Sequence, residues 1–197
     1  MSLLTIQQRL NALLPALQSP RLLGNQGIGN EIGFYIFDYN PEDEPLVQQQ
    51  IPKLKSKLES PPTSLKVIEI DLYGAVLSIL DDRRVLQKAF DLEASKGNAA
   101  LEKSVKPMVR PEQVVEYIQR QLQGDEQLIF LTGVGACYPI LRSHTVLNNL
   151  HPVLDRTPLV MFFPGSYDGH ELRLFNTLKD DNYYRAFPLV PRQEFSV

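Results

Sequence analysis

Several residue types that build common kinds of site are scarce in this chain of 197 residues. The single cysteine, Cys137, excludes an internal disulfide, as is usual for proteins of a reducing cytoplasm. Three histidines, His144, His151 and His170, show no H-x-x-x-H spacing and have no cysteine pair beside them. Structural zinc sites are built from such sets. The composition therefore predicts neither a disulfide framework nor a metal site.

Long apolar runs and a strong charge of one sign are also missing. No apolar run approaches the roughly 20 residues that span a bilayer, and residues 1–17 lack a basic leader, so we expect no membrane span and no signal peptide. The 20 basic and 23 acidic residues leave a net charge of −3, and the basic ones are scattered. Binding to nucleic acid needs clustered cations. We therefore expect a cytoplasmic protein without specific nucleic-acid binding.

Short apolar runs alternate with segments of helical periodicity along the chain. The runs predict strands at residues 34–37, 66–71, 127–132 and 158–163, with shorter ones at 172–175 and 183–187. The first helix is predicted over residues 3–17, with Thr5 and Gln8 as a capping box. We expect Pro52 to kink or break the helix that follows residue 42. The polar stretch from Ser95 to Pro111 is expected to be an exposed loop.

This alternation predicts one α/β domain over residues 1–197. Strands joined by helices favour right-handed crossovers and a mainly parallel sheet. We expect three layers, with about four or five strands in the central sheet and helices on both faces. The predicted order is P-loop-like or Rossmann-like, but the chain contains no P-loop sequence.

Three predicted loops gather at the carboxyl ends of the strands, where open α/β sheets bind ligands. The first loop follows strand 34–37 and begins with Asp38, in the position of a metal-holding carboxylate of nucleotide hydrolases. That role requires a G-x-x-x-x-G-K-[ST] loop, which the chain lacks. Capping of a turn or of the next helix by Asp38 is therefore favoured.

The second loop, residues 132–139, opens a helix expected over 139–150. Its glycines, Gly133 and Gly135, could present backbone amides to an anion, but Tyr138 stands where a third glycine would be needed. A tight strand-to-helix turn is favoured. Cys137 would need a base to act as a nucleophile, and His144 is placed on the apolar stripe of the following helix. Packing is therefore favoured over catalysis for this pair.

The third loop covers residues 164–170. It does not match a nucleophile elbow, because Pro164 stands where a glycine is required before Ser166. The pair Asp168-Gly169 instead predicts a tight turn into the next strand. Glycines such as Gly165 allow close approach of the backbone, and Tyr167 offers an apolar face with a polar tip.

Because none of these loops holds a complete reactive centre, we favour recognition of another protein over catalysis. Tyrosine is enriched at binding hot spots, so Tyr138 and Tyr167 are the expected anchors. The alternative, that both tyrosines cover the end of the core, carries equal weight. The candidate partner-binding residues are Asp38, Gly133, Gly135, Tyr138, Pro164, Gly165, Tyr167 and Asp168.

Three segments together resemble a known family. They are NEIGFYIFDYNP at 30–41, LTGVGACYPILRSH at 131–144, and FFPGSYDG at 162–169 followed by Leu172, Leu174 and Phe175. Their order and spacing resemble BrxB, a small component of the BREX phage-defence systems of bacteria and archaea, over roughly residues 20–190.

The resemblance implies a set of partners: a PglZ-type protein of the alkaline phosphatase superfamily, a large BrxC-type ATPase and an adenine-specific DNA methyltransferase. It implies a non-enzymatic adaptor without a cofactor, bridging the PglZ-like and BrxC-like components, with a homodimer as a further possibility. Two alternatives stay open. One is a degenerate domain that senses a nucleotide. The other is a metal-dependent nuclease or hydrolase using Asp38 with Glu69 or Asp71.

Overall fold

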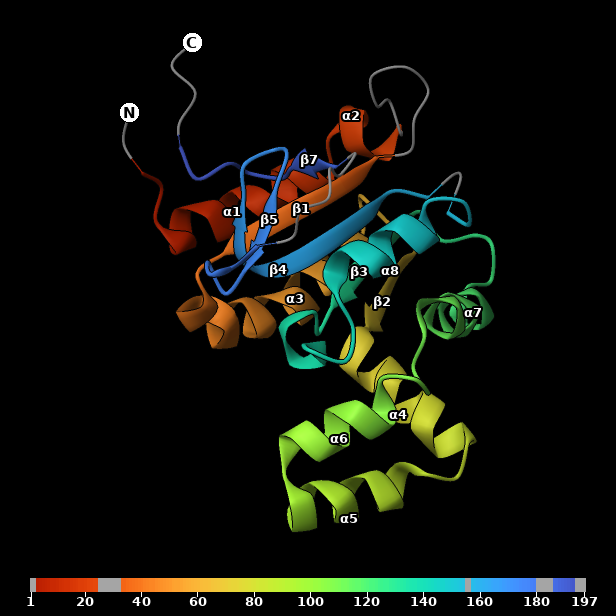
Figure 1. The fold of residues 1–197 in the computed structure, drawn as a ribbon. Helices are drawn as coiled ribbons and strands as arrows, with labels where there is room; N and C mark the ends of the chain where they lie inside the picture. The colour runs from red at the N-terminus through yellow and green to blue at the C-terminus, as the bar shows by residue number, and fades with distance from the viewer. Residues whose placement is uncertain (1–2, 25–32, 155–156, 180–185, 194–197) are drawn as a thin grey trace.

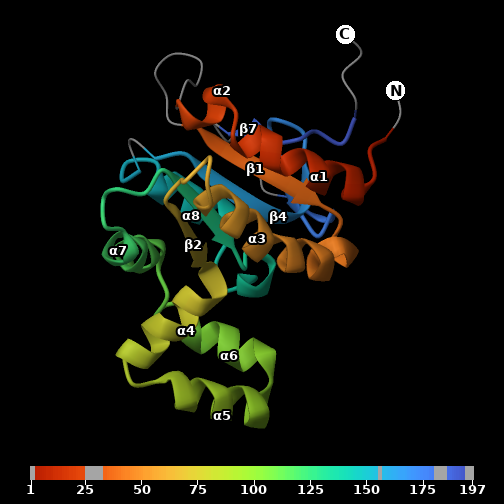
Figure 2. The ribbon, with the colours of Figure 1, turned by 180° about the vertical axis from the view of Figure 1, so that it is seen from behind.

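The computed structural model describes residues 3–24, 33–154, 157–179 and 186–193 (Figures 1 and 2). Its centre is a sheet of strand order β2-β3-β4-β1-β7. Neighbouring strands in this order are all parallel. The strands are β1 (Phe34–Tyr39), β2 (Val67–Asp71), β3 (Leu128–Thr132), β4 (Leu159–Tyr167) and β7 (Phe187–Pro188). The expected α/β fold with a mainly parallel sheet is therefore confirmed.

Helices cover both faces of the sheet (Figures 1 and 2). One face carries α1 (Ile6–Leu17), α2 (Pro20–Leu23) and α3 (Glu44–Glu59), with the short 3-10 helix η1 (Pro41–Asp43) before α3. The other face carries α4 (Leu72–Asp82), α7 (Pro111–Gln121) and α8 (Ser143–Leu150), with the 3-10 helix η2 (Gly135–Cys137) before α8. Beyond α4, the hairpin of α5 (Leu86–Lys96) and α6 (Asn98–Val105) projects from the sheet and its helices (Figure 1).

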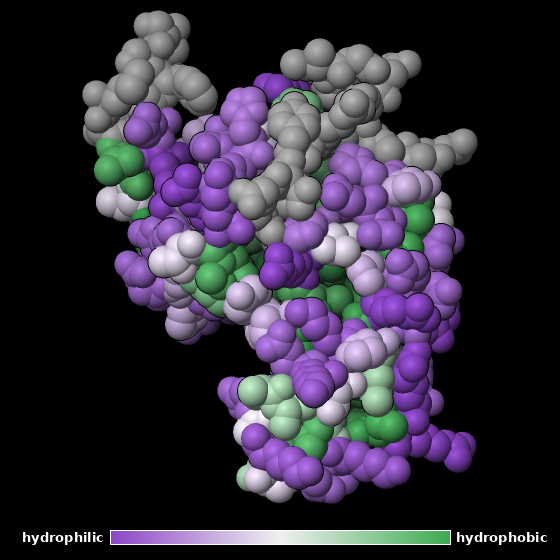
Figure 3. Space-filling model, viewed as in Figure 1, coloured by the Kyte–Doolittle hydropathy of each residue, from purple (hydrophilic) through white to green (hydrophobic). Residues whose placement is uncertain are grey.

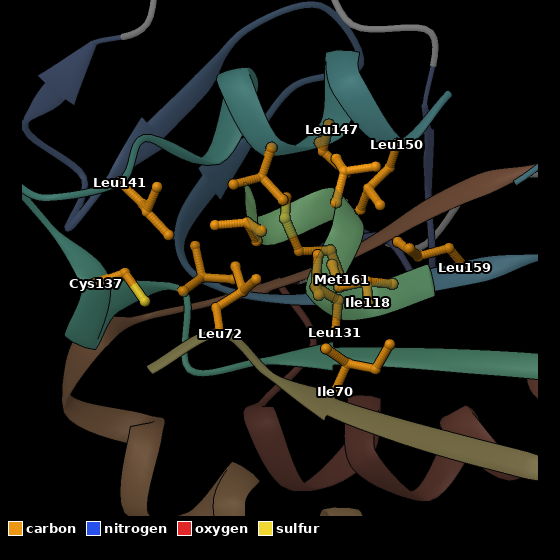
Figure 4. Close-up of a cluster of buried hydrophobic side chains, with 14 of the residues drawn as sticks. Ile70, Leu72, Ile118, Leu131, Cys137, Leu141, Leu147, Leu150, Leu159 and Met161 are labelled. Atoms are coloured by element: carbon orange, nitrogen blue, oxygen red, sulfur yellow. The ribbon is translucent and has the colours of Figure 1, made fainter. Parts of the chain in front are cut away.

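Strand β1 shows how the sequence builds this sandwich. All six of its residues are buried, and their side chains alternate between the two faces. Phe34 and Ile36 join the cluster under α4, α7 and α8, whereas Tyr35, Phe37 and Tyr39 join the cluster under α1 and α3. Figure 4 shows part of the first cluster, in which sheet side chains meet those of α7 and α8. Burying each aromatic ring contributes roughly 1.5–3 kcal/mol before conformational entropy is counted.

Helix ends follow local sequence rules in some places and not in others. The capping box is confirmed: Thr5 Oγ1 accepts from Gln8 N–H at 3.2 Å, and Gln8 Oε1 accepts from Thr5 N–H at 2.9 Å. Of the kink or break expected at Pro52, the break is wrong, because α3 runs without interruption from Glu44 to Glu59. Pro52 lies on the exposed face of α3, where water can hydrate the backbone carbonyl that loses its partner.

Two further expectations about local structure need correction, and a third falls mostly on residues that the structure does not describe. The polar stretch from Ser95 to Pro111 contains helix α6 rather than only a loop, because Leu101 and Val105 pack against the cluster under α4. The helix expected from Pro139 begins only at Ser143, and residues 138–140 form a turn instead. The expected strand at 183–187 lies mostly outside the described residues.

A short antiparallel extension continues β4 past the parallel sheet. Strand β5 (Leu172–Leu174) pairs with the end of β4, and β6 (Leu178–Lys179) pairs with β5. The segment from Pro164 to Tyr167 is therefore strand, so the loop expected over 164–170 is wrong for these four residues. None of the described helices is long and apolar enough to cross a bilayer.

Candidate functional site

The second and third predicted loops meet at the carboxyl ends of β3 and β4. A Cβ added to Gly135 would lie 2.9 Å from Pro164 Cγ and 3.1 Å from the ring of Phe175, so the two segments pack directly on each other. The rings of Tyr138 and Phe175 form an edge-to-face pair with centroids 6.4 Å apart. The sequence placed these segments side by side, but it did not indicate Phe175 as the partner of Tyr138.

The glycines of these segments are explained by close packing. Gly133 has a φ of +71°, and a Cβ there would lie 1.9 Å from Asp71 Oδ1. That carboxylate caps α4 by accepting from Tyr73 N–H at 3.0 Å. At Gly165, a Cβ would lie 2.1 Å from the carbonyl oxygen of Arg173 on β5. These contacts require glycine without any bound anion, which supports the tight-turn interpretation of the G-x-G pattern.

Asp38 is the buried centre of an ion-pair network. Its Oδ1 accepts from Arg9 Nη2 at 2.9 Å, and its Oδ2 accepts from Arg192 Nε at 2.7 Å and from Tyr167 N–H at 3.3 Å. It does not cap a helix: Asn40 is the N-cap of η1 and Asp43 that of α3. The expectation of a capping role is therefore wrong.

The two arginines of this network tie distant segments to the sheet. Arg9 also donates to the carbonyl oxygens of Asp38 at 2.5 Å and Val190 at 3.0 Å. Arg192 also donates to Asn40 Oδ1 at 2.8 Å and to the carbonyl oxygen of Gly165 at 2.5 Å. Burial lowers the pKa of the Arg9 guanidinium, and the Asp38 carboxylate opposes that shift. The network therefore fastens α1 and the segment at 186–193 to the ends of β1 and β4.

A shared metal site for Asp38 and the acids of β2 is not compatible with the strand order. Strands β3 and β4 separate β1 from β2, which places the two strands about 14 Å apart at the usual inter-strand spacing. Glu69 accepts from Thr132 Oγ1 at 3.2 Å, and Asp71 caps α4. Across the described residues, no group of three or more His, Cys, Asp or Glu side chains could hold a metal ion.

Cys137 lies buried in η2. Burial raises the pKa of its thiol to about 12, and the negative charge of Asp71 adds to the shift. The thiol is therefore protonated at neutral pH, which removes the thiolate that a nucleophile needs. His144 lies separately on α8.

Tyr167 and Asp168 have structural positions at the end of β4. Tyr167 is 8% exposed, and its hydroxyl donates to the carbonyl oxygen of Ala186 at 2.8 Å. It covers the end of the core, which is the alternative that the sequence left open beside the role of an anchor. Asp168 Oδ1 accepts from the N–H groups of His170 and Glu171 at 2.8 and 2.7 Å, and these bonds lower its pKa. The tight turn predicted at Asp168-Gly169 is confirmed.

Tyr138 is the predicted anchor that remains at the surface. It lies between two hollows, one bounded by α4, α5 and α6 and the other by Arg142, Leu178 and neighbouring residues. Three aromatic rings around it are unusually exposed: Tyr73 (41%), Phe90 (43%) and Phe175 (37%). We call Tyr73, Phe90, Tyr138 and Phe175 the aromatic edge. Sequence reasoning missed Tyr73, Phe90 and Phe175, because no local pattern shows which side chains the rest of the fold leaves uncovered.

The family model and the similar proteins that match this chain all point to the same family. A family model described as "BREX protein BrxB" matches residues 68–189. A protein of that name from Bacillus cereus (strain H3081.97) is 47% identical over 191 residues, which cover 95% of this chain and 98% of the relative. Another from Escherichia coli O9:H4 (strain HS) is 30% identical over 187 residues, covering 94% and 92%. No solved structure matches the chain.

Proposed function

The chain belongs to the BrxB family of BREX phage-defence proteins, and from this premise we propose that it is a non-enzymatic, cytoplasmic adaptor. In this proposal it bridges a PglZ-like protein and a BrxC-like ATPase. It uses no cofactor and binds no specific nucleic acid itself.

The aromatic edge is the observation that carries this proposal. Aromatic side chains dominate the hot spots of protein interfaces, because they bury a large area and lose little conformational freedom. Tyr73 and Phe90 each keep about two fifths of their surface exposed in the described structure. Tyr73 directly follows the carboxyl end of β2, the edge at which open α/β sheets bind ligands, and Phe90 on α5 lines the same hollow. A binding surface is the simplest role for such an arrangement.

The candidate reactive groups are held by contacts within the fold, which also favours an adaptor over an enzyme. Asp38 is held between two guanidinium groups, and the Cys137 thiol is buried and protonated. A residue fixed in this way contributes to stability, and using it for chemistry would first require breaking its present contacts.

The nucleotide-sensing alternative has one observation in its favour, the strand order with β1 between β4 and β7. The segment after β1 opposes it, because η1 begins with Pro41-Glu42-Asp43. Two acidic residues there would repel the phosphates that a P-loop normally holds. We therefore expect calorimetry with ATP and magnesium to give no binding heat. Saturable heat would favour nucleotide sensing.

Co-purification tests the adaptor directly. The tagged chain is co-expressed with its PglZ-like and BrxC-like neighbours and examined by size-exclusion chromatography with light scattering. We expect co-elution with the PglZ-like protein, and a three-component species when the ATPase is included. Separate elution of well-folded proteins would overturn the proposal, as would magnesium-dependent ATP or DNA hydrolysis by the purified chain.

A further inference from the structure

The α5–α6 hairpin and α4 surround a groove that the described residues do not fill. The hollow has a volume of about 260 Å³ and is closed on one side by residues 136–140. Figure 3 shows hydrophobic side chains reaching the surface of the lobe that α5 and α6 form. Its floor is buried, with Val76, Leu80, Ala89 and Val105 among the lining residues.

One face of helix α5 lines this groove. Its lining residues are Leu86, Ala89, Phe90 and Glu93, which follow the spacing i, i+3, i+4, i+7. That spacing is one face of an α-helix, the face that normally packs against other helices. Phe90 nevertheless remains 43% exposed. The packing face of α5 is therefore only partly covered.

One face of helix α6 also lines the groove. Its lining residues, Asn98, Leu101, Glu102 and Val105, repeat the i, i+3, i+4, i+7 spacing. Only Val105 of the helix is buried. The packing face of α6, like that of α5, therefore has room for a neighbour.

Helix α4 supplies the third stripe, from Tyr73, Val76, Leu77 and Leu80. The spacing is again i, i+3, i+4, i+7. Tyr73, at the start of this stripe, is 41% exposed. Three helical packing faces thus converge on one groove, as in a helix bundle whose last member is missing.

From this geometry we propose that the groove receives an amphipathic helix from a partner protein. An apolar face with anchors at helical spacing fills such a groove, and the bound helix completes the bundle of α4, α5 and α6. This inference rests on the proposed adaptor function and adds the place and the chemistry of one contact.

The charges around the groove specify the occupant further. Its charged lining residues, Glu93 and Glu102, are both acidic, and no lysine or arginine lines it. Glu102 forms an i,i+4 pair with Lys106 at 3.2 Å, whereas Glu93 forms no ion pair within the described chain. The complementary helix therefore carries lysine or arginine beside its apolar stripe, opposite Glu93.

Other kinds of occupant fit the groove less well. Its volume is below the roughly 300–1,000 Å³ of typical small-molecule sites, but it suits the inserted side chains of a helix lying across it. A nucleic acid would bring phosphates toward Glu93 and Glu102. A partner helix is favoured by both the shape and the charge.

Charge reversal with a matched control tests the site. Glu93→Lys and Asp91→Lys make the same charge change on α5, but only Glu93 lines the groove. Phe90→Ala is paired in the same way with Leu92→Ala, another apolar truncation on α5 outside the groove lining. Each variant is co-expressed with the PglZ-like and BrxC-like proteins, its melting temperature is measured, and its affinity for the recovered partner is determined.

We expect Glu93→Lys and Phe90→Ala each to weaken binding by about 30-fold or more, which corresponds to the usual hot-spot threshold. The controls should bind like the wild type, and all four variants should melt like it. Wild-type binding that neither groove variant changes would overturn the groove assignment and leave the adaptor standing. A wild-type chain that recovers no partner would overturn the adaptor and the groove together.

Photo-crosslinking identifies the occupant. A benzoylphenylalanine placed at position 90 in the co-expressed complex should link to a partner segment with apolar residues at helical spacing and nearby lysine or arginine. The same group at position 91 should give little product. Crosslinking from position 90 to an acidic segment, or to DNA, would overturn the proposed chemistry.

Discussion

The strands of the sheet bury their apolar side chains, whereas the α5–α6 hairpin leaves several of its own exposed. All six residues of β1 and all five of β3 are buried. By contrast, α5 buries only Ala89 and α6 only Val105, while Phe90 is 43% exposed. The apolar surface of the sheet is therefore buried and stabilises the fold, whereas part of the apolar surface of the hairpin remains exposed to solvent.

This difference indicates how stability and binding are divided in the molecule. Regions with few buried contacts open most easily, and binding surfaces are often drawn from them. Exposed apolar patches of this kind mark interaction sites in soluble proteins. In our proposal, the sheet holds the fold, and the hairpin with the aromatic edge is the surface that a partner completes.

The same substitution in the two regions should give the largest contrast. Phe162 packs edge-on against Phe37 and Phe130, with centroids 6.0 and 5.3 Å away. Phe162→Ala should lower the free energy of unfolding by about 3–5 kcal/mol, because it leaves a cavity in the core. Phe90→Ala should lower it by less than about 1 kcal/mol, because the ring is already partly in water. Urea denaturation measures both, and equal losses would break the comparison.

The Asp38 network should give the next largest effect. Asp38→Asn keeps the shape of the side chain but leaves two guanidinium groups without their shared carboxylate. We expect a loss of about 3 kcal/mol, the lower end of the range for breaking a buried ion pair, because Arg192 is partly exposed. Asp168→Asn, at an exposed turn, serves as the control. A loss below about 1 kcal/mol at Asp38 would show that the network does not hold the fold.

Tyr167→Phe should have a smaller effect. It removes the hydroxyl that donates to the carbonyl oxygen of Ala186. The expected loss of stability is about 1 kcal/mol, the usual contribution of one buried hydrogen bond. Partner binding should be unchanged, because Tyr167 lies in the core. Weaker partner binding with an unchanged melting temperature would show that Tyr167 contributes to the interface.

The smallest effect concerns pH. The pKa of Cys137 is raised to about 12 by burial. Above pH 8.5 an unfolded chain loses this proton, whereas the folded chain keeps it. The contribution of the thiol to the free energy of unfolding is therefore fully present well below pH 8.5 and falls as the pH rises. Between pH 7 and 9 the expected loss from this group is about 0.8 kcal/mol. Cys137→Ala should remove that part of the slope, whereas an unchanged slope, or rapid thiol labelling of the native protein at pH 8, would contradict the assignment.

Local sequence signals were enough to place β1, β2, β3, β5 and the first part of β4, together with the Thr5–Gln8 capping box and the turn at Asp168. They could not reveal the environment of Asp38, because its arginine partners lie 29 and 154 residues away in the chain. The continuation of β4 to Tyr167 depends on pairing with β5, which no local pattern encodes. The groove was hidden for the same reason, because the uncovered faces of α4, α5 and α6 follow from the tertiary arrangement.

Hydrogen–deuterium exchange, with the chain alone and bound to its PglZ-like partner, tests the central claim most directly. Alone, the amides of α5 and α6 should exchange much faster than those of β1, β3 and β4, because the hairpin has few buried contacts. In the complex, protection should rise in α4, α5 and α6 and stay unchanged in the sheet. Protection confined to other segments, or a hairpin that is already as slow as the sheet in the free chain, would contradict the account.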